Sequence, residues 1–157
     1  MSKFQLKVFF KAAYDLILVF LQFFIISLHF FQWQFFPQKQ IIQETPFSYF
    51  LGILIIIISL IIIIVSIKDL GKNLSPFPRP INNSNLVTTG IYRFTRHPMY
   101  YSLIFISIGF FIIKLSIYYL FLTISLTLII KFKIALEEKY LMNKFKNYLL
   151  YKNEVKY

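Results

Sequence analysis

Long apolar runs alternate with short polar segments along this chain of 157 residues. The runs cover residues 12–36, 47–67, 99–113 and 115–130, and Lys114 alone separates the last two. At about 1.5 Å per residue, the second run would form a helix of roughly 31 Å, which matches the hydrocarbon core of a bilayer. We therefore expect membrane-spanning helices, the last two forming a hairpin with Lys114 at its tip.

Two polar segments complete the pattern. Residues 68–97 carry prolines at positions 76, 78 and 80, which favour an extended loop. In residues 132–151, Leu141, Phe145 and Tyr148 recur at helical spacing. This spacing predicts an amphipathic helix that lies on the membrane surface or packs on the loop.

The predicted fold class is all-α: an integral membrane helical bundle of about four transmembrane helices, including a C-terminal helical hairpin, with a cytoplasmic amphipathic tail helix. We divide this single membrane domain into two parts. Residues 1–69 form the N-terminal transmembrane helices, and residues 70–157 form the loop, the hairpin and the tail.

Composition agrees with a membrane protein, because 58% of the residues are hydrophobic and the mean hydropathy is +0.67. The net charge of +11 could indicate nucleic-acid binding. However, the lysines flank the apolar runs, where positive charge is typical of cytoplasmic loops. The N-terminus, the loop and the tail are rich in Lys and Arg, so we expect both termini in the cytoplasm. We expect the first run to be retained, because it is too long for a signal peptide and lacks a cleavage site.

The chain has no cysteine and only two histidines, His29 and His97. Disulfides and thiolate chemistry are therefore excluded, and we expect no metal site. His29 lies in the aromatic stretch 29–33, which we interpret as a belt at the outer membrane interface. We interpret Asp15 as an interfacial residue.

Scarce polar groups gather in the stretch GIYRFTRHPMYYS, residues 90–102. We expect His97 to end the loop and Pro98 to open the third spanning helix. Arg93, Arg96 and His97 would then surround a helix N-terminus, which favours an anion. By itself this pattern fits a carboxylate or phosphate site and an anchor for lipid head groups equally well.

Two adjacent acids, Glu137 and Glu138, follow the last apolar run. Carboxylates at this place could bind an amine or act as a base. For an isolated pair of glutamates, a solvated helix surface is the commoner explanation.

Together these motifs resemble the isoprenylcysteine carboxyl methyltransferase and phospholipid methyltransferase superfamily. The similarity lies in LVTTGIYRFTRHPMYYS, followed about 35 residues later by EEKYLMNKFKNYLLY, and it covers residues 70–151. The matching positions are Leu86-Val87, Gly90, Tyr92, Arg96 to Tyr100, Glu137-Glu138, Leu141, Phe145, Tyr148 and Tyr151.

The resemblance implies an enzyme that binds S-adenosylmethionine at the cytoplasmic membrane surface and takes a lipid-like or prenylated acceptor from the bilayer. It implies no metal and no nucleic-acid partner. It assigns the cofactor contacts to Ser84, Asn85, Leu86, Val87, Tyr92, His97, Pro98, Met99, Tyr100 and Glu137. The expected catalytic residues are Arg96, His97, Lys133 and Glu137.

Lys133 departs from the pattern of the prenylcysteine enzymes, in which the matching arginine faces the acceptor carboxylate. Lysine keeps the charge but loses the bidentate fork, so a prenylcysteine acceptor does not follow from the resemblance. Two alternatives stay open: an NADPH-dependent sterol-type membrane reductase, which has a similar loop, and a non-catalytic scaffold that binds anionic lipid.

Overall fold

The computed structural model describes residues 3–31 and 39–156. In these ranges the chain forms five α-helices and two short 3-10 helices, with no strand. The α-helices are α1 (Lys3–Phe30), α2 (Pro46–Leu70), α3 (Pro98–Lys114), α4 (Ile117–Lys144) and α5 (Tyr148–Glu154), and the 3-10 helices are η1 (Gly71–Asn73) and η2 (Gly90–Arg93). The predicted fold class is confirmed.

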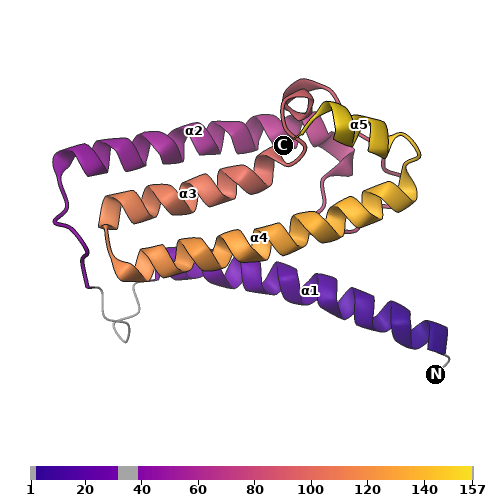
Figure 1. Cartoon of the computed structure of the whole chain (residues 1–157), viewed down its shortest axis with the longest axis horizontal. Coiled ribbons are helices and arrows are strands. Elements are labelled where there is room, and N and C mark those ends of the chain that lie inside the picture. Colours follow the sequence, from indigo (N-terminus) through magenta and orange to yellow (C-terminus); the bar gives the residue numbers. More distant parts are fainter. Residues whose placement is uncertain (1–2, 32–38, 157) are drawn as a thin grey trace.

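Three helices are long and apolar enough to cross a bilayer: α1 from residue 12 onward, α2 and α4. The 17 residues of α3 form a shorter apolar helix that lies beside α2 (Figure 1). The chain is therefore a multi-pass membrane protein. The last five residues of the first predicted span, 32–36, lie outside the described residues.

The predicted hairpin is confirmed. Helix α3 ends at Lys114, and Leu115 takes the left-handed conformation with a φ of 43°. Ser116 then caps α4, because its side chain accepts a hydrogen bond from the Tyr119 backbone N–H. On the other side of the turn, the Ile41 N–H donates to the Leu115 carbonyl at 2.7 Å, which ties the linker before α2 to the hairpin tip.

The predicted boundary between the last span and the amphipathic tail is wrong. Helix α4 continues without a break to Lys144, and the chain leaves helical geometry only at Phe145. No glycine or proline interrupts residues 117–144, so no residue in this segment ends the helix. The last part of the predicted tail forms a separate short helix, α5. This helix packs on the loop, which is one of the two arrangements expected for the tail.

Helices α2 and α3 pack closely because glycines face each other across the contact. A Cβ on Gly52 would lie 2.7 Å from the Gly109 carbonyl oxygen, and one on Gly109 would lie 2.9 Å from that of Gly52. Small residues that allow backbones to approach are a common way to join helices in membranes.

A buried polar network joins α1, α3 and α4. His29 contacts the Ser107 hydroxyl through Nε2 at 2.7 Å, and Ser107 contacts the Thr123 hydroxyl at 2.8 Å. The other ring nitrogen of His29 lies 2.9 Å from the Ile25 carbonyl oxygen, so Nδ1 carries the proton. His29 therefore faces the inside of the bundle, and its placement in an outer aromatic belt is corrected. Residues 32 and 33 of that belt lie outside the described residues.

Candidate functional site

The polar residues of interest gather at one end of the bundle. There α2 ends, α3 begins and α4 runs into α5, while the loop between α2 and α3 covers the end (Figure 1). Helices α1 to α4 thus support this end, and the loop and α5 form walls of a cavity there.

Asp69 and Gly90 fix the last part of the loop. The Asp69 carboxylate, at the end of α2, accepts a hydrogen bond of 2.8 Å from the Ile91 backbone N–H. Gly90 has a φ of 61°, and a Cβ at this position would collide with the same carboxylate. This turn starts η2 and brings Tyr92 into the interior, where it is buried.

His97 and Pro98 start α3 as predicted. Pro98 stands in the first turn, and His97 is the N-cap residue with φ −133° and ψ 54°, which is not helical. The buried His97 ring stacks on Tyr100 with a centroid distance of 5.7 Å. Its Nε2 lies 3.5 Å from Glu138 Oε1 and makes no hydrogen bond among the described residues.

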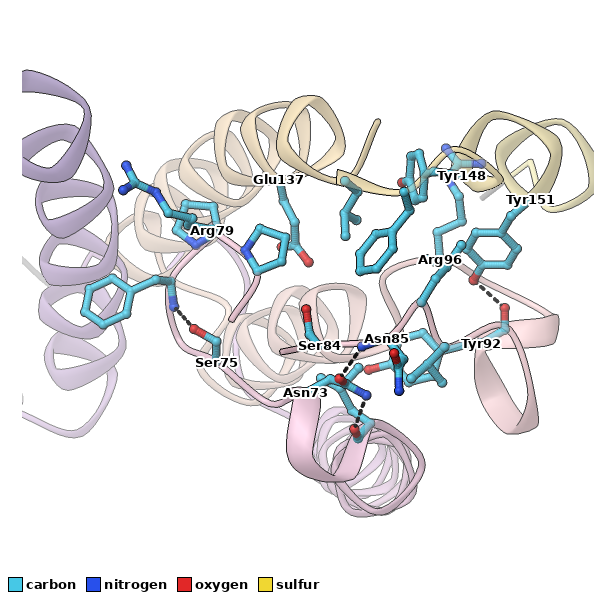
Figure 2. Close-up of a pocket in the computed structure, with 18 residues that line it drawn as sticks. Asn73, Ser75, Arg79, Ser84, Asn85, Tyr92, Arg96, Glu137, Tyr148 and Tyr151 are labelled. Atoms are coloured by element: carbon cyan, nitrogen blue, oxygen red, sulfur yellow. Dashed lines mark hydrogen bonds between the residues drawn. The ribbon is translucent and has the colours of Figure 1, made fainter. Parts of the chain in front are cut away.

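The cavity lies between the loop, α4 and α5 (Figure 2). Seven of the residues predicted from the sequence line it, namely Ser84, Asn85, Leu86, Val87, Tyr92, Arg96 and Glu137. Five others do not line it: His97, Pro98, Met99, Tyr100 and Lys133. Of these five, Tyr100 still contacts the lining residue Glu137, and His97 contacts Tyr100 in turn.

Glu137 is the acidic group of the cavity. Figure 2 shows its carboxylate pointing from α4 into the space between the loop and α5. Its Oε2 accepts a hydrogen bond of 2.6 Å from the hydroxyl of Tyr100 on α3, and this bond orients the carboxylate. A negative group held in this way suits a cation or a pair of hydroxyl groups.

Lys133 lies one turn deeper on α4 and is 1% exposed. Its ammonium donates a hydrogen bond of 2.5 Å to the Gln22 side chain of α1 and lies 5.2 Å from the centre of the Tyr100 ring. Consecutive contacts from Glu137 to Tyr100, from Tyr100 to Lys133 and from Lys133 to Gln22 therefore connect the cavity with the interior of the helical bundle. Within the described residues no carboxylate lies within 4 Å of this ammonium.

Arg96 was expected to face an anion at the N-terminus of α3, but its guanidinium is occupied by partners within the protein. Its Nε donates to Glu138 Oε1 at 3.0 Å, and its Nη1 contacts the carbonyl oxygens of Lys152 and Val155. Arg93 is exposed and does not line the cavity.

Buried phenols form the wall opposite the loop. Tyr148 and Tyr151 on α5 are 1% and 7% exposed, and burial raises the pKa of the Tyr151 phenol to about 12. Burial likewise raises the pKa values of the Tyr92 and Tyr148 phenols. These phenols therefore stay protonated at neutral pH, and Tyr151 donates a hydrogen bond of 2.6 Å to the Tyr92 carbonyl.

A family model decides what this arrangement belongs to. The model described as phospholipid methyltransferase matches residues 47–148, which is more than half of the chain. The chain belongs to the phospholipid methyltransferase family. No curated protein and no solved structure matches it.

Membership makes the protein a membrane methyltransferase, and the resemblance seen in the sequence motifs is confirmed at the level of the family. Enzymes of this family use S-adenosylmethionine, and the family implies a lipid-related substrate. Among the described residues, no three metal-ligating side chains gather in one place.

Several residues in and around the cavity were not predicted from the sequence. Lys144 donates to three oxygen atoms of the loop, those of the Ile81 and Asn82 carbonyls and the Ser84 hydroxyl. Arg79 pairs with Asp15 of α1 at 3.1 Å, so Asp15 is buried against the loop rather than at the lipid interface. The missed residues that line the cavity are Leu70, Asn73, Ser75, Phe77, Pro78, Arg79, Pro80, Leu141, Phe145, Tyr148 and Tyr151.

Only part of this group carried a signal in the sequence. The proline-rich run at residues 75–80 predicted an extended segment, and such a segment can form a wall. Leu141, Phe145, Tyr148 and Tyr151 belong to the family pattern but received no role there. Asp15 and its partner Arg79 are far apart in the sequence, and so are Gln22 and its partner Lys133. No local pattern indicates such pairs.

Proposed function

We propose that this protein transfers the methyl group of S-adenosylmethionine to a lipid-like or isoprenoid-linked acceptor, with the donor in the cavity around Glu137. The observation that carries the proposal is the position of the Glu137 carboxylate. It points into a cavity lined by Ser84 to Val87 and by Tyr92, the residues that the family resemblance assigns to the cofactor.

The residues present suit the chemical groups of the donor. A carboxylate such as Glu137 matches the positive amine or sulfonium, or the hydroxyl groups of a ribose. The aromatic rings of Tyr92, Phe145 and Tyr148 offer faces on which an adenine can stack. Asn85 and Ser84 add polar groups on the loop side.

Lys133 is the group that we assign to the acceptor. It lies on the membrane side of Glu137, and a buried ammonium favours an anionic oxygen such as a carboxylate or phosphate. Because lysine acts as a point charge rather than a planar fork, either anion fits. Tyr100 lies between Lys133 and Glu137, so the acceptor head group would meet the donor near this ring.

The reaction asks little of the side chains except position. When bound, the donor supplies an electrophilic methyl group, whose C–S bond breaks toward sulfur as an acceptor oxygen or nitrogen forms the new bond. A carboxylate acceptor is already ionised and needs no general base, whereas an amine would lose a proton. The residues of the site orient the acceptor, and the buried tyrosines exclude water.

We place the site at the cytoplasmic face. The segments that gather there, residues 68–97 and 131–157, are rich in Lys and Arg, as cytoplasmic segments of membrane proteins are. Both termini would then lie in the cytoplasm.

Binding of the methyl donor tests the proposal directly. Purified protein in detergent should bind S-adenosylmethionine in a calorimetric titration. Glu137→Gln should weaken this binding by about 1.5–3 kcal/mol, because a charged hydrogen-bond acceptor is lost. The matched control is Glu154→Gln, because Glu154 is exposed and lies outside the cavity.

Two results would contradict the proposal. Tight binding of NADPH without binding of S-adenosylmethionine would favour a reductase. Identical behaviour of the wild type and a His97→Ala/Glu137→Gln double variant would favour a lipid-binding scaffold. If the donor binds, labelled S-adenosylmethionine and extracted membrane lipids will identify the acceptor by the label it receives.

A further inference from the structure

Helix α5 forms one wall of the cavity, and its position therefore sets the shape of the cavity. Tyr148 and Tyr151 project from this helix toward the cavity, opposite the loop (Figure 2). Tyr151 also reaches across to the Tyr92 carbonyl at 2.6 Å. Any movement of α5 would displace two of the buried rings around Glu137.

An ion cluster behind this wall holds α5 in place. We call Arg96, Glu138 and Lys152 the Glu138 cluster. Glu138 Oε1 accepts from Arg96 Nε at 3.0 Å, and its Oε2 accepts from Lys152 Nζ at 2.7 Å. Arg96 also donates to the carbonyl oxygen of Lys152, at 3.4 Å, and to that of Val155. Arg96, just before α3, thus binds the backbone at the end of α5, and Glu138 on α4 binds the Lys152 side chain of α5.

The Glu138 cluster is shielded from solvent. The side chains of Arg96 and Glu138 are 12% and 11% exposed, whereas that of Lys152 is 34% exposed. Removing one partner of a shielded ion pair leaves an uncompensated charge, which makes such a cluster sensitive to single substitutions. Glu138 follows Glu137 directly in the sequence, so the cluster and the cavity carboxylate share one turn of α4.

The two walls of the cavity are held in different ways. The loop wall is fixed at several points, by Lys144 to three loop oxygens and by Asn73 to the Asn85 N–H at 2.9 Å. In contrast, α5 joins α4 through the non-helical residues 145–147.

We propose that the Glu138 cluster positions α5 for binding of the methyl donor, with Arg96, Glu138 and Lys152 acting as positioning residues rather than as contacts of the reacting atoms. This inference rests on the proposed function. It gives the second glutamate of the Glu-Glu pair a role different from that of the first, and it assigns the charge of Arg96 to the protein instead of to a bound anion.

Lys152→Met is the sharpest test, because Lys152 does not line the cavity and is only partly buried. The affinity of the Lys152→Met variant for S-adenosylmethionine should fall about 5- to 150-fold, the usual range for coupling between two sites. Lys152→Arg should restore the affinity, because it restores the charge. The matched control is Lys146→Met, which removes an exposed lysine near α5 and should bind the donor like the wild type. Glu138→Gln should reproduce the loss, provided that it folds.

Hydrogen exchange supplies a second measurement that does not depend on turnover. If the position of α5 that the Glu138 cluster holds favours the donor by some factor, the bound donor must favour this position by the same factor and protect the α5 amides of the wild-type protein accordingly. In Lys152→Met, these amides should exchange faster without the donor. Wild-type affinity in both Lys152→Met and Glu138→Gln would overturn the inference. Failure of the wild type to bind S-adenosylmethionine would instead overturn the proposed function.

Discussion

Gly90 has to satisfy two constraints at once. Its φ of 61° favours glycine, and the Asp69 carboxylate occupies the space that a side chain would need. Gly71 shares only the first constraint, because its φ is 53° but no atom lies within 4 Å of a Cβ placed there. The two glycines therefore separate backbone strain from the contact with Asp69.

We expect Gly71→Ala to lower the free energy of unfolding by about 1–3 kcal/mol, the cost of holding an alanine at φ 53° and ψ −123°, a sparsely populated region of backbone conformation. Gly90→Ala should lose more, since Asp69 must also move and release the Ile91 N–H. It should also weaken binding of S-adenosylmethionine, because Tyr92 follows this turn. Thermal unfolding in detergent and calorimetry measure the two effects. Equal losses of stability in the two variants would show that Asp69 does not restrict the turn.

Lys133 provides a second test at this scale. Lys133→Met should keep donor binding but weaken binding of an anionic acceptor by about 2–5 kcal/mol, the cost of removing one partner of a buried charged contact. Lys131→Met is the control, because Lys131 is an exposed lysine on the same helix. The measurement is KM for the acceptor identified by methyl labelling, at saturating S-adenosylmethionine. A loss of donor affinity with unchanged KM for the acceptor would contradict the assignment.

Helix pairs are joined in two different ways. Helices α2 and α3 meet through the glycine contact, whereas α1 is joined to α3 and α4 by the hydrogen bonds of His29, Ser107 and Thr123. In a membrane, hydrophobic contacts do not favour protein over lipid, so packing and hydrogen bonds determine which helices associate.

Ser107→Ala should therefore destabilise the bundle by about 0.6–1.7 kcal/mol, the range for hydrogen bonds between membrane helices. Ser59→Ala is the matched control, because Ser59 is similarly buried and, within the part of the chain that the structure describes, its hydroxyl bonds only to the Ile55 carbonyl of its own helix. Unfolding by SDS measures both variants. A loss in Ser59→Ala as large as that in Ser107→Ala would mean that the network does not join the helices.

The existence of the elements could be predicted, but their contacts could not. Apolar runs, Pro98 and Lys114 mark the helices and the hairpin, because bilayer thickness and proline geometry act locally. The lack of glycine and proline in residues 117–144 is a local sign that α4 continues past Ile130, but the partner that holds the buried Lys133 could not be predicted, since Gln22 lies 111 positions away. The predicted cofactor contacts at residues 84–87, Tyr92 and Glu137 do line one cavity, whereas most other lining residues come from segments whose contacts no local pattern indicates. Arg96 was expected beside a bound anion, but its partners Glu138 and Val155 depend on how α5 folds back.

At the scale of the whole molecule, the structure has two different ends. The end with the cavity gathers the long loop, the end of α4 and α5, whereas the other end holds the hairpin tip and the linker before α2 (Figure 1). The two ends also differ in basic residues, and this difference is the basis for the proposed orientation.

Introduced cysteines can test this orientation cleanly, because the chain has none of its own. Cysteine at Lys114 or Lys39 should react with a membrane-impermeant thiol reagent added to intact cells. Cysteine at Lys72 or Lys146 should react only after the membrane is permeabilised. The reverse pattern would place the cavity on the outer face, and reaction at all four positions would contradict a multi-pass arrangement.

Helix α1 lies outside the part of the chain that the family model matches, and yet it reaches the site with two polar side chains. Asp15 contacts the outer side of the loop through Arg79, and Gln22 contacts Lys133. The cavity that we propose for the donor is built almost wholly from the matched part. Exchange of one helix could therefore change which lipid head group is accepted while the donor site stays as it is.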